Sequence, residues 1–527
     1  MRKLYIVIAC IFQTLYCFGQ INFQSGFGDI LKDIGSKVVK TSNGNYCIVA
    51  GTGQEQPDSA DITVFFANYL GEMNSSVKIG MGRNELPTGL VETIDGDFII
   101  SGTTYSSPLD STQSDIFAIK INSSGDVLWS FVYGGDQDDE AKSLFKTPDN
   151  KFIIVGNTKS FGSSDMSALV LKIDEDGNQI WCNVNGALSV NYFNQGDLTI
   201  DDQYIFGGGT FNGSHTDNYL VKMNTSGGII WSRRYGTIGA DWISDIKATS
   251  DSGFIMAGIS SENTAGDTDQ CVIKLDSTGG LIWAYNYGTS GYDRSFSIIE
   301  NSIKHFIICG YTNIDTSGNV INQLVLDEID SVGNVVWANI YGDSVQTYEG
   351  YYVIPGIDDG YVAVGFSVAF GEPNGDALFL KTDDNGISGC DEFPMFLNRN
   401  PVTLTDSSGA VEQMVQLNFQ SVDMIGIDYT NSYAQNCVFD NIKDFTNKNY
   451  ANSLAKLYPN PAEKLLTIET ELDNSIATIF DQMGRSVYKQ KFNARKTTID
   501  ISSLSPGIYF LELLSKNNLS KNKFIKE

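Results

Sequence analysis

The chain has 527 residues, which is too long for one compact core, so we expect at least two domains. A hydrophobic content of 42% argues against a disordered chain, and 52 glycines with only 11 prolines indicate a β-rich chain with many tight turns. The net charge of −28 is concentrated before residue 451, because residues 451–527 hold 11 Lys/Arg and only 8 Asp/Glu. Such an acidic body repels phosphate backbones, which argues against a nucleic-acid partner.

The N-terminus has the features of a secretory signal peptide. Arg2 and Lys3 form a basic start, and residues 4–15 form an apolar stretch that is too short to span a bilayer. Cys17-Phe18-Gly19 offers a cleavage site before Gln20. We therefore predict a signal peptide at residues 1–19, no transmembrane segment in the mature chain, and a secreted protein. Residues 7–10 loosely resemble a lipoprotein box, which leaves lipidation as an alternative.

From residue 20 the chain repeats itself with a period near 52 residues. The anchor of each copy is a residue followed by glycine: Phe27-Gly28, Ile79-Gly80, Tyr133-Gly134, Asn185-Gly186, Tyr235-Gly236, Tyr287-Gly288 and Tyr341-Gly342. An aromatic residue stands four positions earlier in six copies: Phe23, Trp129, Trp181, Trp231, Trp283 and Trp337. We expect this aromatic column to pack between repeats.

Each copy contains four strand-like runs. In the third copy these runs are residues 141–146, 152–156, 168–171 and 179–181. The third and fourth runs are joined by a polar turn that closes on glycine, the residue that adopts positive φ without strain. Four short antiparallel strands in about 50 residues are typical of a propeller blade. The fold class that we predict is all-β, with a seven-bladed β-propeller over residues 20–386.

The ring of blades has a predicted closing strand. The last copy has its first three strands but lacks the strand with the aromatic residue, whereas residues 21–27 form an isolated fourth strand with Phe23 in the tryptophan position. We expect this N-terminal strand to complete the last blade, because it would pair an otherwise open sheet edge.

Acidic residues recur at two positions of the repeat. The first column lies six residues after the first residue of each anchor and holds Asp33, Glu85, Asp139, Asp241 and Asp293. The second column begins the third strand and holds Asp61, Asp115, Asp217, Asp269 and Asp376. Both columns fall in links that cross the same face of a propeller, so they are candidate binding residues on an acidic face. They either accept hydrogen bonds from loop amides or bind Ca²⁺, which prefers several oxygen ligands; no other cofactor is indicated.

A non-repeat extension follows at residues 387–437, and then a polar linker at residues 438–455. Cys390 and Cys437 bracket the extension and are the candidates for a disulfide in an oxidising compartment. Cys47, Cys182, Cys271 and Cys309 each fall alone in a strand pattern, where a cysteine is usually a small core residue.

The last 72 residues change character to short strands with regular turns, as in a small β-sandwich of the Ig-like type. Four motifs occur in order: Pro459-Asn460-Pro461, Asp481-x-x-Gly484-Arg485, Leu504-x-x-Gly507-x-Tyr509, and a basic stretch from Lys521 to Lys526. With these motifs the segment resembles the type A C-terminal sorting domains of the bacterial type IX secretion system. The resemblance implies that residues 456–527 engage the secretion machinery and that the protein is released or attached at the outer cell surface.

The sequence holds few residues suited to catalysis. There are two histidines in different repeats, and there is no Cys-x-x-Cys pair, nucleophile elbow or phosphate-binding loop. We therefore predict a non-catalytic binding or adhesion protein whose ligand is a glycan or a surface protein. The alternative is a secreted hydrolase or lyase that uses carboxylates on the propeller face to degrade polysaccharide or protein.

Overall fold

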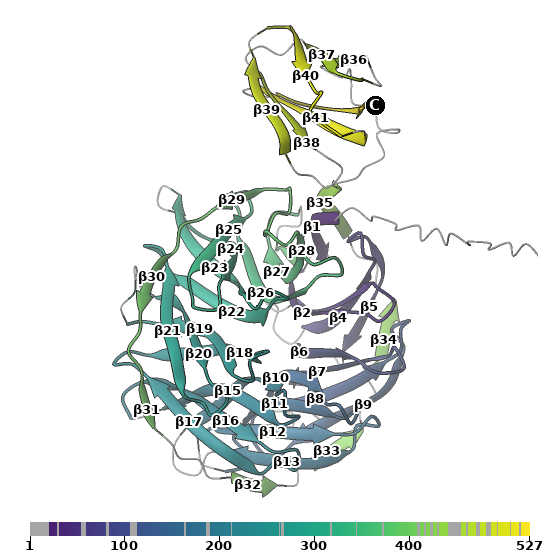
Figure 1. Cartoon of the computed structure of the whole chain (residues 1–527). Coiled ribbons are helices and arrows are strands. Elements are labelled where there is room, and N and C mark those ends of the chain that lie inside the picture. The colour runs from purple at the N-terminus through teal and green to yellow at the C-terminus, as the bar shows by residue number, and fades with distance from the viewer. Residues whose placement is uncertain are drawn as a thin grey trace, which may run out of the picture. The chain divides into compact units, whose positions relative to one another are not determined.

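A computed structural model describes the chain from residue 21 to residue 526 (Figure 1). The description omits residues 29–30, 54–59, 81–83, 106–112, 163–164, 186–189, 212, 263, 265–267, 317–318, 344, 371–373, 408–411, 416–417, 422–424, 429–431, 441–454, 460–461, 471–474, 481–485, 493, 506 and 516–517. The predicted signal peptide and most of the predicted linker therefore lie outside the described residues. The chain divides into two compact units, one over residues 20–439 and one whose described part is the C-terminal segment.

Every described element is a β-strand, and the first unit is built from a repeated sheet. The first four sheets comprise β2 (Asp33–Lys40), β3 (Tyr46–Thr52), β4 (Asp61–Ala67) and β5 (Met73–Gly80); β6 (Glu85–Glu92), β7 (Phe98–Thr104), β8 (Asp115–Ile121) and β9 (Val127–Gly134); β10 (Asp139–Lys146), β11 (Phe152–Thr158), β12 (Ser167–Ile173) and β13 (Gln179–Asn185); β14 (Asn191–Leu198), β15 (Tyr204–Phe211), β16 (Thr216–Met223) and β17 (Ile229–Gly236). The next three comprise β18 (Asp241–Ala248), β19 (Phe254–Ser260), β20 (Asp269–Leu275) and β21 (Leu281–Gly288); β22 (Asp293–Glu300), β23 (Phe306–Thr316), β24 (Asn319–Ile329) and β25 (Val335–Tyr341); β26 (Tyr348–Pro355), β27 (Tyr361–Ser367), β28 (Asp376–Thr382) and β1 (Ile21–Gly28).

The strands within each sheet are antiparallel neighbours in chain order, except in the last sheet, where β1 from the N-terminus supplies the fourth strand. β1 pairs with β28 in a register that sets Phe23 opposite Lys381 and Phe27 opposite Ala377. Phe23 and Phe27 are fully buried and pack on Phe379. The strand therefore closes a hydrophobic core between the last sheet and the first.

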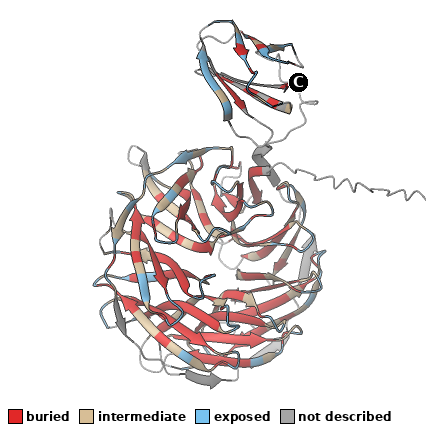
Figure 2. Cartoon of the chain, viewed as in Figure 1, coloured by how far each residue is buried: buried red, intermediate tan, exposed pale blue. Residues whose placement is uncertain are grey.

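The described sheets form a closed ring. The first strand of each sheet contacts the first strand of the next, from β2 through β6, β10, β14, β18, β22 and β26, and β26 contacts β2 again. These strands surround the centre in Figure 1, while the fourth strands lie toward the periphery. Buried side chains of successive sheets pack together. Much of the length of the ring strands is coloured red, as buried, in Figure 2. The unit is thus an all-β, propeller-like ring of antiparallel sheets.

The anchor tyrosines tie four of the sheets to the next one. Tyr133 donates its hydroxyl hydrogen bond to the carbonyl of Gly177 in the following sheet, at 2.6 Å, and Tyr287 does the same to Gly333 at 2.8 Å. The indole of Trp129 donates to the carbonyl of Glu175, also in the following sheet, at 3.0 Å. The aromatic column therefore packs between sheets, as we predicted from the repeat. The glycines that close the third-to-fourth-strand turns, Gly71, Gly125, Gly177, Gly227, Gly279, Gly333 and Gly386, all have positive φ.

The extension after the last repeat adds a fifth strand to every sheet of the ring. Its strands are β29 (Glu392–Pro394), β30 (Asn398–Pro401), β31 (Thr405–Ser407), β32 (Glu412–Val415), β33 (Asn418–Ser421), β34 (Ile425–Asp428) and β35 (Ser432–Asp440). Each pairs with the fourth strand of one sheet and so covers part of its outer edge. A covered edge cannot pair with another chain.

The C-terminal unit consists of two antiparallel sheets that share one core. One sheet holds β36 (Ala455–Tyr458), β37 (Leu465–Thr470) and β40 (Lys496–Asp500), and the other holds β38 (Ser475–Phe480), β39 (Ser486–Phe492), β41 (Gly507–Ser515) and β42 (Asn518–Lys526). Leu466 and Ile468 of the first sheet pack with Ile479 and Leu511 of the second. No helix among the described residues has the length and apolarity needed to cross a membrane.

Candidate functional site

The two acidic columns meet at the junctions between sheets. The backbone amide of a first-column residue donates to the carbonyl just before a second-column residue of the preceding sheet, as Asp139 does to Ser114 at 2.7 Å and Glu85 does to Ala60 at 2.8 Å. The acids of both columns are buried, apart from Asp61, which is partly exposed in an ion pair with Lys78 at 2.8 Å. The described structure therefore places these residues inside the ring wall and not on an open face.

The anchor glycines make room for these carboxylates. A Cβ on Gly28 would lie 2.3 Å from Asp376 Oδ1 and 2.6 Å from Asp33 Oδ2. The same arrangement brings Asp61 and Glu85 together at Gly80, and Asp115 and Asp139 at Gly134. Asp217 and Asp269 occupy the corresponding space at Gly236 and Gly288.

Loop amides hold three of the first-column carboxylates. Asp139 accepts from the amide of Gly135 at 2.8 Å, Asp241 from Thr237 at 2.7 Å and Asp293 from Thr289 at 2.7 Å. Burial raises the pKa of each of these three carboxyls, while the amide and hydroxyl hydrogen bonds oppose that shift. Within the described ranges, no three His, Cys, Asp or Glu side chains are grouped so that they could hold a metal ion. Calcium binding at these columns stays a prediction.

A different set of side chains lies on the inner strands. In each first strand the first and third residues are buried, whereas the second and fourth are at least partly exposed. The fourth residue is a β-bulge in all seven of these strands. Bulges re-aim a side chain and are frequent beside functional sites.

Two neighbouring sheets place aromatic residues at this bulge. Phe296 of β22 and Tyr351 of β26 meet edge to face with ring centroids 5.0 Å apart, and Tyr311 of β23 lies 5.8 Å from Phe296. The guanidinium of Arg294 sits 4.4 Å from the centre of the Phe296 ring. Tyr351 donates its hydroxyl hydrogen bond to Glu349. We call Arg294, Phe296, Tyr311, Glu349 and Tyr351 the axial cluster.

Burial and neighbouring charges shift the pKa values of the two tyrosines in the axial cluster. Burial raises the pKa of Tyr351, and the neighbouring Glu349 carboxylate raises it further. Burial also raises the pKa of Tyr311, partly offset by the Arg294 cation. Both phenols therefore stay neutral near pH 7 and can donate or accept hydrogen bonds. Trp242, the second residue of β18, is 48% exposed and lies beside Tyr192 of β14, outside the axial cluster.

Charged side chains from other inner strands of the ring also approach one another. Lys37 of β2 lies over the Tyr352 ring of β26, with Nζ 3.9 Å from the ring centre. Asp245 and Lys247 of β18 form an ion pair at 2.9 Å, and they come from the other side of the ring. Burial lowers the pKa of Lys37 to about 8, an effect that Asp245 opposes and Lys247 reinforces. Lys37 of β2, Tyr352 of β26 and the ion pair of β18 thus bring together groups from three inner strands of the ring.

Sequence reasoning did not identify the axial cluster. The available pattern is the bulge position itself, which holds Phe296 and Tyr351 in two adjacent copies but Ser36, Thr88, Lys142, Asn194 and Ser244 in the others. The predicted disulfide is described only at one end. Cys390 is disulfide-bonded, Cys47, Cys182, Cys271 and Cys309 are free and buried, and the side chain of Cys437 lies outside the described residues.

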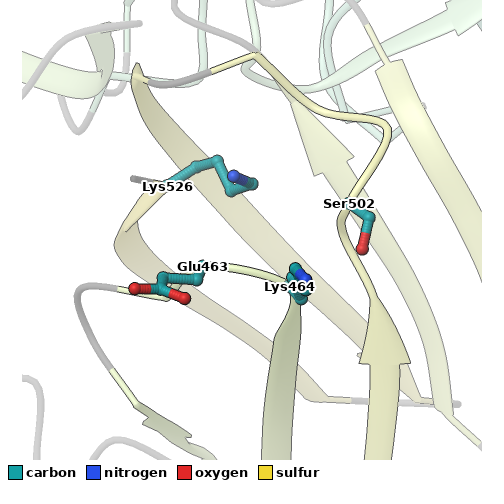
Figure 3. Close-up of a pocket in the computed structure, with 4 residues that line it drawn as sticks. All are labelled: Glu463, Lys464, Ser502 and Lys526. Carbon is teal, nitrogen blue, oxygen red and sulfur yellow. The ribbon is translucent and has the colours of Figure 1, made fainter.

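In the C-terminal unit, a shallow pocket of about 300 Å³ is lined by Glu463, Lys464, Ser502 and Lys526 (Figure 3). Of the predicted sorting residues, Gly507 begins β41, and Tyr509 is buried, stacks on Phe524 and donates to the carbonyl of Ser505 at 2.8 Å. Pro459 follows a cis peptide bond. Asn460, Pro461 and Gly484 lie outside the described residues.

Comparison with known proteins assigns the C-terminal unit. Residues 456–527 match the family model described as the secretion system C-terminal sorting domain. The chain is therefore a type IX secretion cargo, which is secreted or attached at the cell surface. No curated protein sequence matches the chain.

Solved structures give only a distant likeness. Sqt1 from Chaetomium thermophilum is similar with a TM-score of 0.40 and 11% identity, over 69% of this chain and 99% of that one. PorZ, a surface component of the type IX secretion system of Porphyromonas gingivalis, has a TM-score of 0.25 and 10% identity, over 94% and 81%. The extracellular domain of BT4673 from B. thetaiotaomicron has a TM-score of 0.17 and 10% identity, over 95% and 99%. At these scores the likenesses carry no argument about function.

Proposed function

We propose that the mature protein is a non-catalytic, surface-exposed or released binding protein that captures glycans through the axial cluster. In this proposal residues 1–19 are the signal peptide, residues 20–386 are a seven-bladed β-propeller, and residues 456–527 are an Ig-like sorting domain. The closed ring of first-strand contacts and the β1–β28 pairing support the propeller assignment. The sorting-domain match supports export.

The observation that carries the binding proposal is the axial cluster. Ligand sites in proteins combine apolar and aromatic surface with a few convergent polar groups. Phe296, Tyr311 and Tyr351 supply ring faces and edges, while Arg294 and Glu349 supply a donor and an acceptor of opposite charge. A saccharide presents C–H faces beside hydroxyls that both donate and accept, so it matches this combination. The strongly acidic body favours a neutral saccharide over an anionic one.

The test is a glycan array probed with the mature protein and its variants. Phe296→Ala and Tyr351→Ala should each weaken binding at least about tenfold, or ~1.4 kcal/mol, because each removes an aromatic ring of the axial cluster. Tyr69→Ala is the matched control, since Tyr69 is 44% exposed in a turn between a third and a fourth strand. Equal binding by all variants would place the glycan site elsewhere. If the protein cleaves a polysaccharide and mutation of one carboxylate abolishes this cleavage, the hydrolytic alternative replaces the binding proposal.

A further inference from the structure

The fifth strands of the ring, β29 to β35, together form what we call the belt. β29 pairs with β25, β30 with β21, β31 with β17, β32 with β13, β33 with β9, β34 with β5, and β35 with β1. The partner sheets follow one another in reverse chain order. The belt therefore passes each sheet of the ring once, in the order opposite to that in which the sheets follow one another along the chain. Its strands lie at the periphery in Figure 1.

Most of the pairings that hold the belt are short. β29 to β34 have three or four residues each, so each contributes few backbone hydrogen bonds. A short two-stranded pairing is marginal in water by itself. The belt covers seven sheet edges, and losing it would leave all of them open. Its retention therefore depends on how its two ends are held.

The two ends of the belt return to the same part of the ring. The segment before β29 leaves the last sheet after β28, where Asn22 of β1 donates to the carbonyl of Ile387 at 2.9 Å. The amide of Gly342, after β25, donates to the carbonyl of Asp391 at 2.8 Å. After a full circle, β35 joins the last sheet beside β1. Cys390 precedes the belt by two residues, and Cys437 lies within β35.

The cysteine inventory leaves one partner for Cys390 in the mature chain. Cys390 is disulfide-bonded, while Cys47, Cys182, Cys271 and Cys309 are free. Of the three remaining cysteines, Cys10 and Cys17 fall in the predicted signal peptide, and the third is Cys437. We propose that a Cys390–Cys437 disulfide clasps the belt and makes it a covalently closed loop around the ring.

The Cys390–Cys437 disulfide forms by an ordinary thiol–disulfide exchange. One of the two cysteines, as a thiolate, attacks the disulfide of an oxidised thiol oxidoreductase in the export compartment and forms a mixed disulfide. The second thiolate then displaces the enzyme sulfur. The two cysteines lose two protons and two electrons in total, and the enzyme leaves as a dithiol.

The clasp changes how the belt can open. With both ends joined, no end is free to peel, so the short pairings must open together. With the disulfide reduced, the β29 end stays continuous with β28, but the β35 end loses its covalent tie, so the pairings can open one after another from β35. The clasp thus makes the edge protection of the whole ring depend on one redox-sensitive bond.

Two measurements on the mature full-length protein test this inference. Peptide mapping without reduction should find residues 390 and 437 in one linked peptide, and two alkylated cysteines or another partner would overturn the pairing. Hydrogen exchange should then be compared between wild type, Cys390→Ser and Cys182→Ala, in which Cys182 is a free, buried cysteine. Amide exchange in the belt should be at least ~10-fold faster in Cys390→Ser, with the first strands unchanged.

Cys182→Ala should leave exchange in the belt at the wild-type rate. If Cys390→Ser does not fold, folded wild type treated with a phosphine reductant takes its place and should show the same acceleration. An unchanged belt in both samples would show that the disulfide does not hold it.

Discussion

Replacing Gly134 by alanine tests the junction of the two acidic columns. The added Cβ would lie 1.7 Å from Asp115 Oδ1 and 3.0 Å from Asp139 Oδ2, so Asp115, which is fully buried, must move. Overpacking a core site costs about 1–3 kcal/mol, and pulling a buried polar group from its partners costs about 1–3 kcal/mol more. We expect the free energy of unfolding to fall by roughly 3–4 kcal/mol, measured by urea denaturation.

Gly96→Ala is the control for this prediction. Gly96 has a φ of 81° and no atom within 4 Å of an added Cβ, so only backbone strain of about 1 kcal/mol is expected. A double-mutant cycle with Asp115→Ala isolates the clash, because removing the carboxylate makes room for the methyl group. The reasoning fails if Gly134→Ala costs no more than Gly96→Ala, or costs the same with and without Asp115.

Three further predictions follow from the fold. Deleting residues 20–27 removes β1, which should lower the melting temperature measured by fluorimetry and promote aggregation measured by light scattering. If neither quantity changes, the ring closes without β1. Burial raises the pKa of Asp327 to about 8. The folded protein therefore keeps the carboxyl proton of Asp327 up to about pH 8, whereas the unfolded chain releases it near pH 4. The contribution of Asp327 to the free energy of unfolding therefore falls as the pH rises from about 4 to 8. Asp327→Asn should therefore raise the melting temperature more at pH 9 than at pH 5, and equal gains would refute the shift. Deleting residues 455–527 should trap the protein in the periplasm, whereas surface labelling of the truncated protein would contradict the role of the sorting domain.

The repeat allowed much of the ring to be predicted. The spacing of anchor glycines and tryptophans marks where strands end and turns begin, and the position of Phe23 suggested that the N-terminal strand belongs with the last copy. The belt could not be predicted in the same way. Its strands of three or four residues are too short for a periodic pattern, and their place is set by backbone pairing with edges far away in the chain.

The candidate site was less accessible to sequence reasoning. The acidic columns are regular in the sequence, but their burial depends on residues from two consecutive copies meeting over one glycine, as Asp115 and Asp139 do at Gly134. The axial cluster is irregular in the sequence, because only two of seven copies carry an aromatic residue at the bulge. The positions that the copies share stand out in the sequence, whereas the axial cluster lies where individual copies differ.

The most direct measurement is hydrogen exchange of the mature protein with and without the tightest-binding neutral oligosaccharide from the array. Glycan capture at the axial cluster predicts protection in β22 and β26 around Phe296 and Tyr351. The turns between third and fourth strands, such as the one containing Gly177, should exchange at the same rate in both samples. Protection at those turns with none in β22 and β26 would contradict the account.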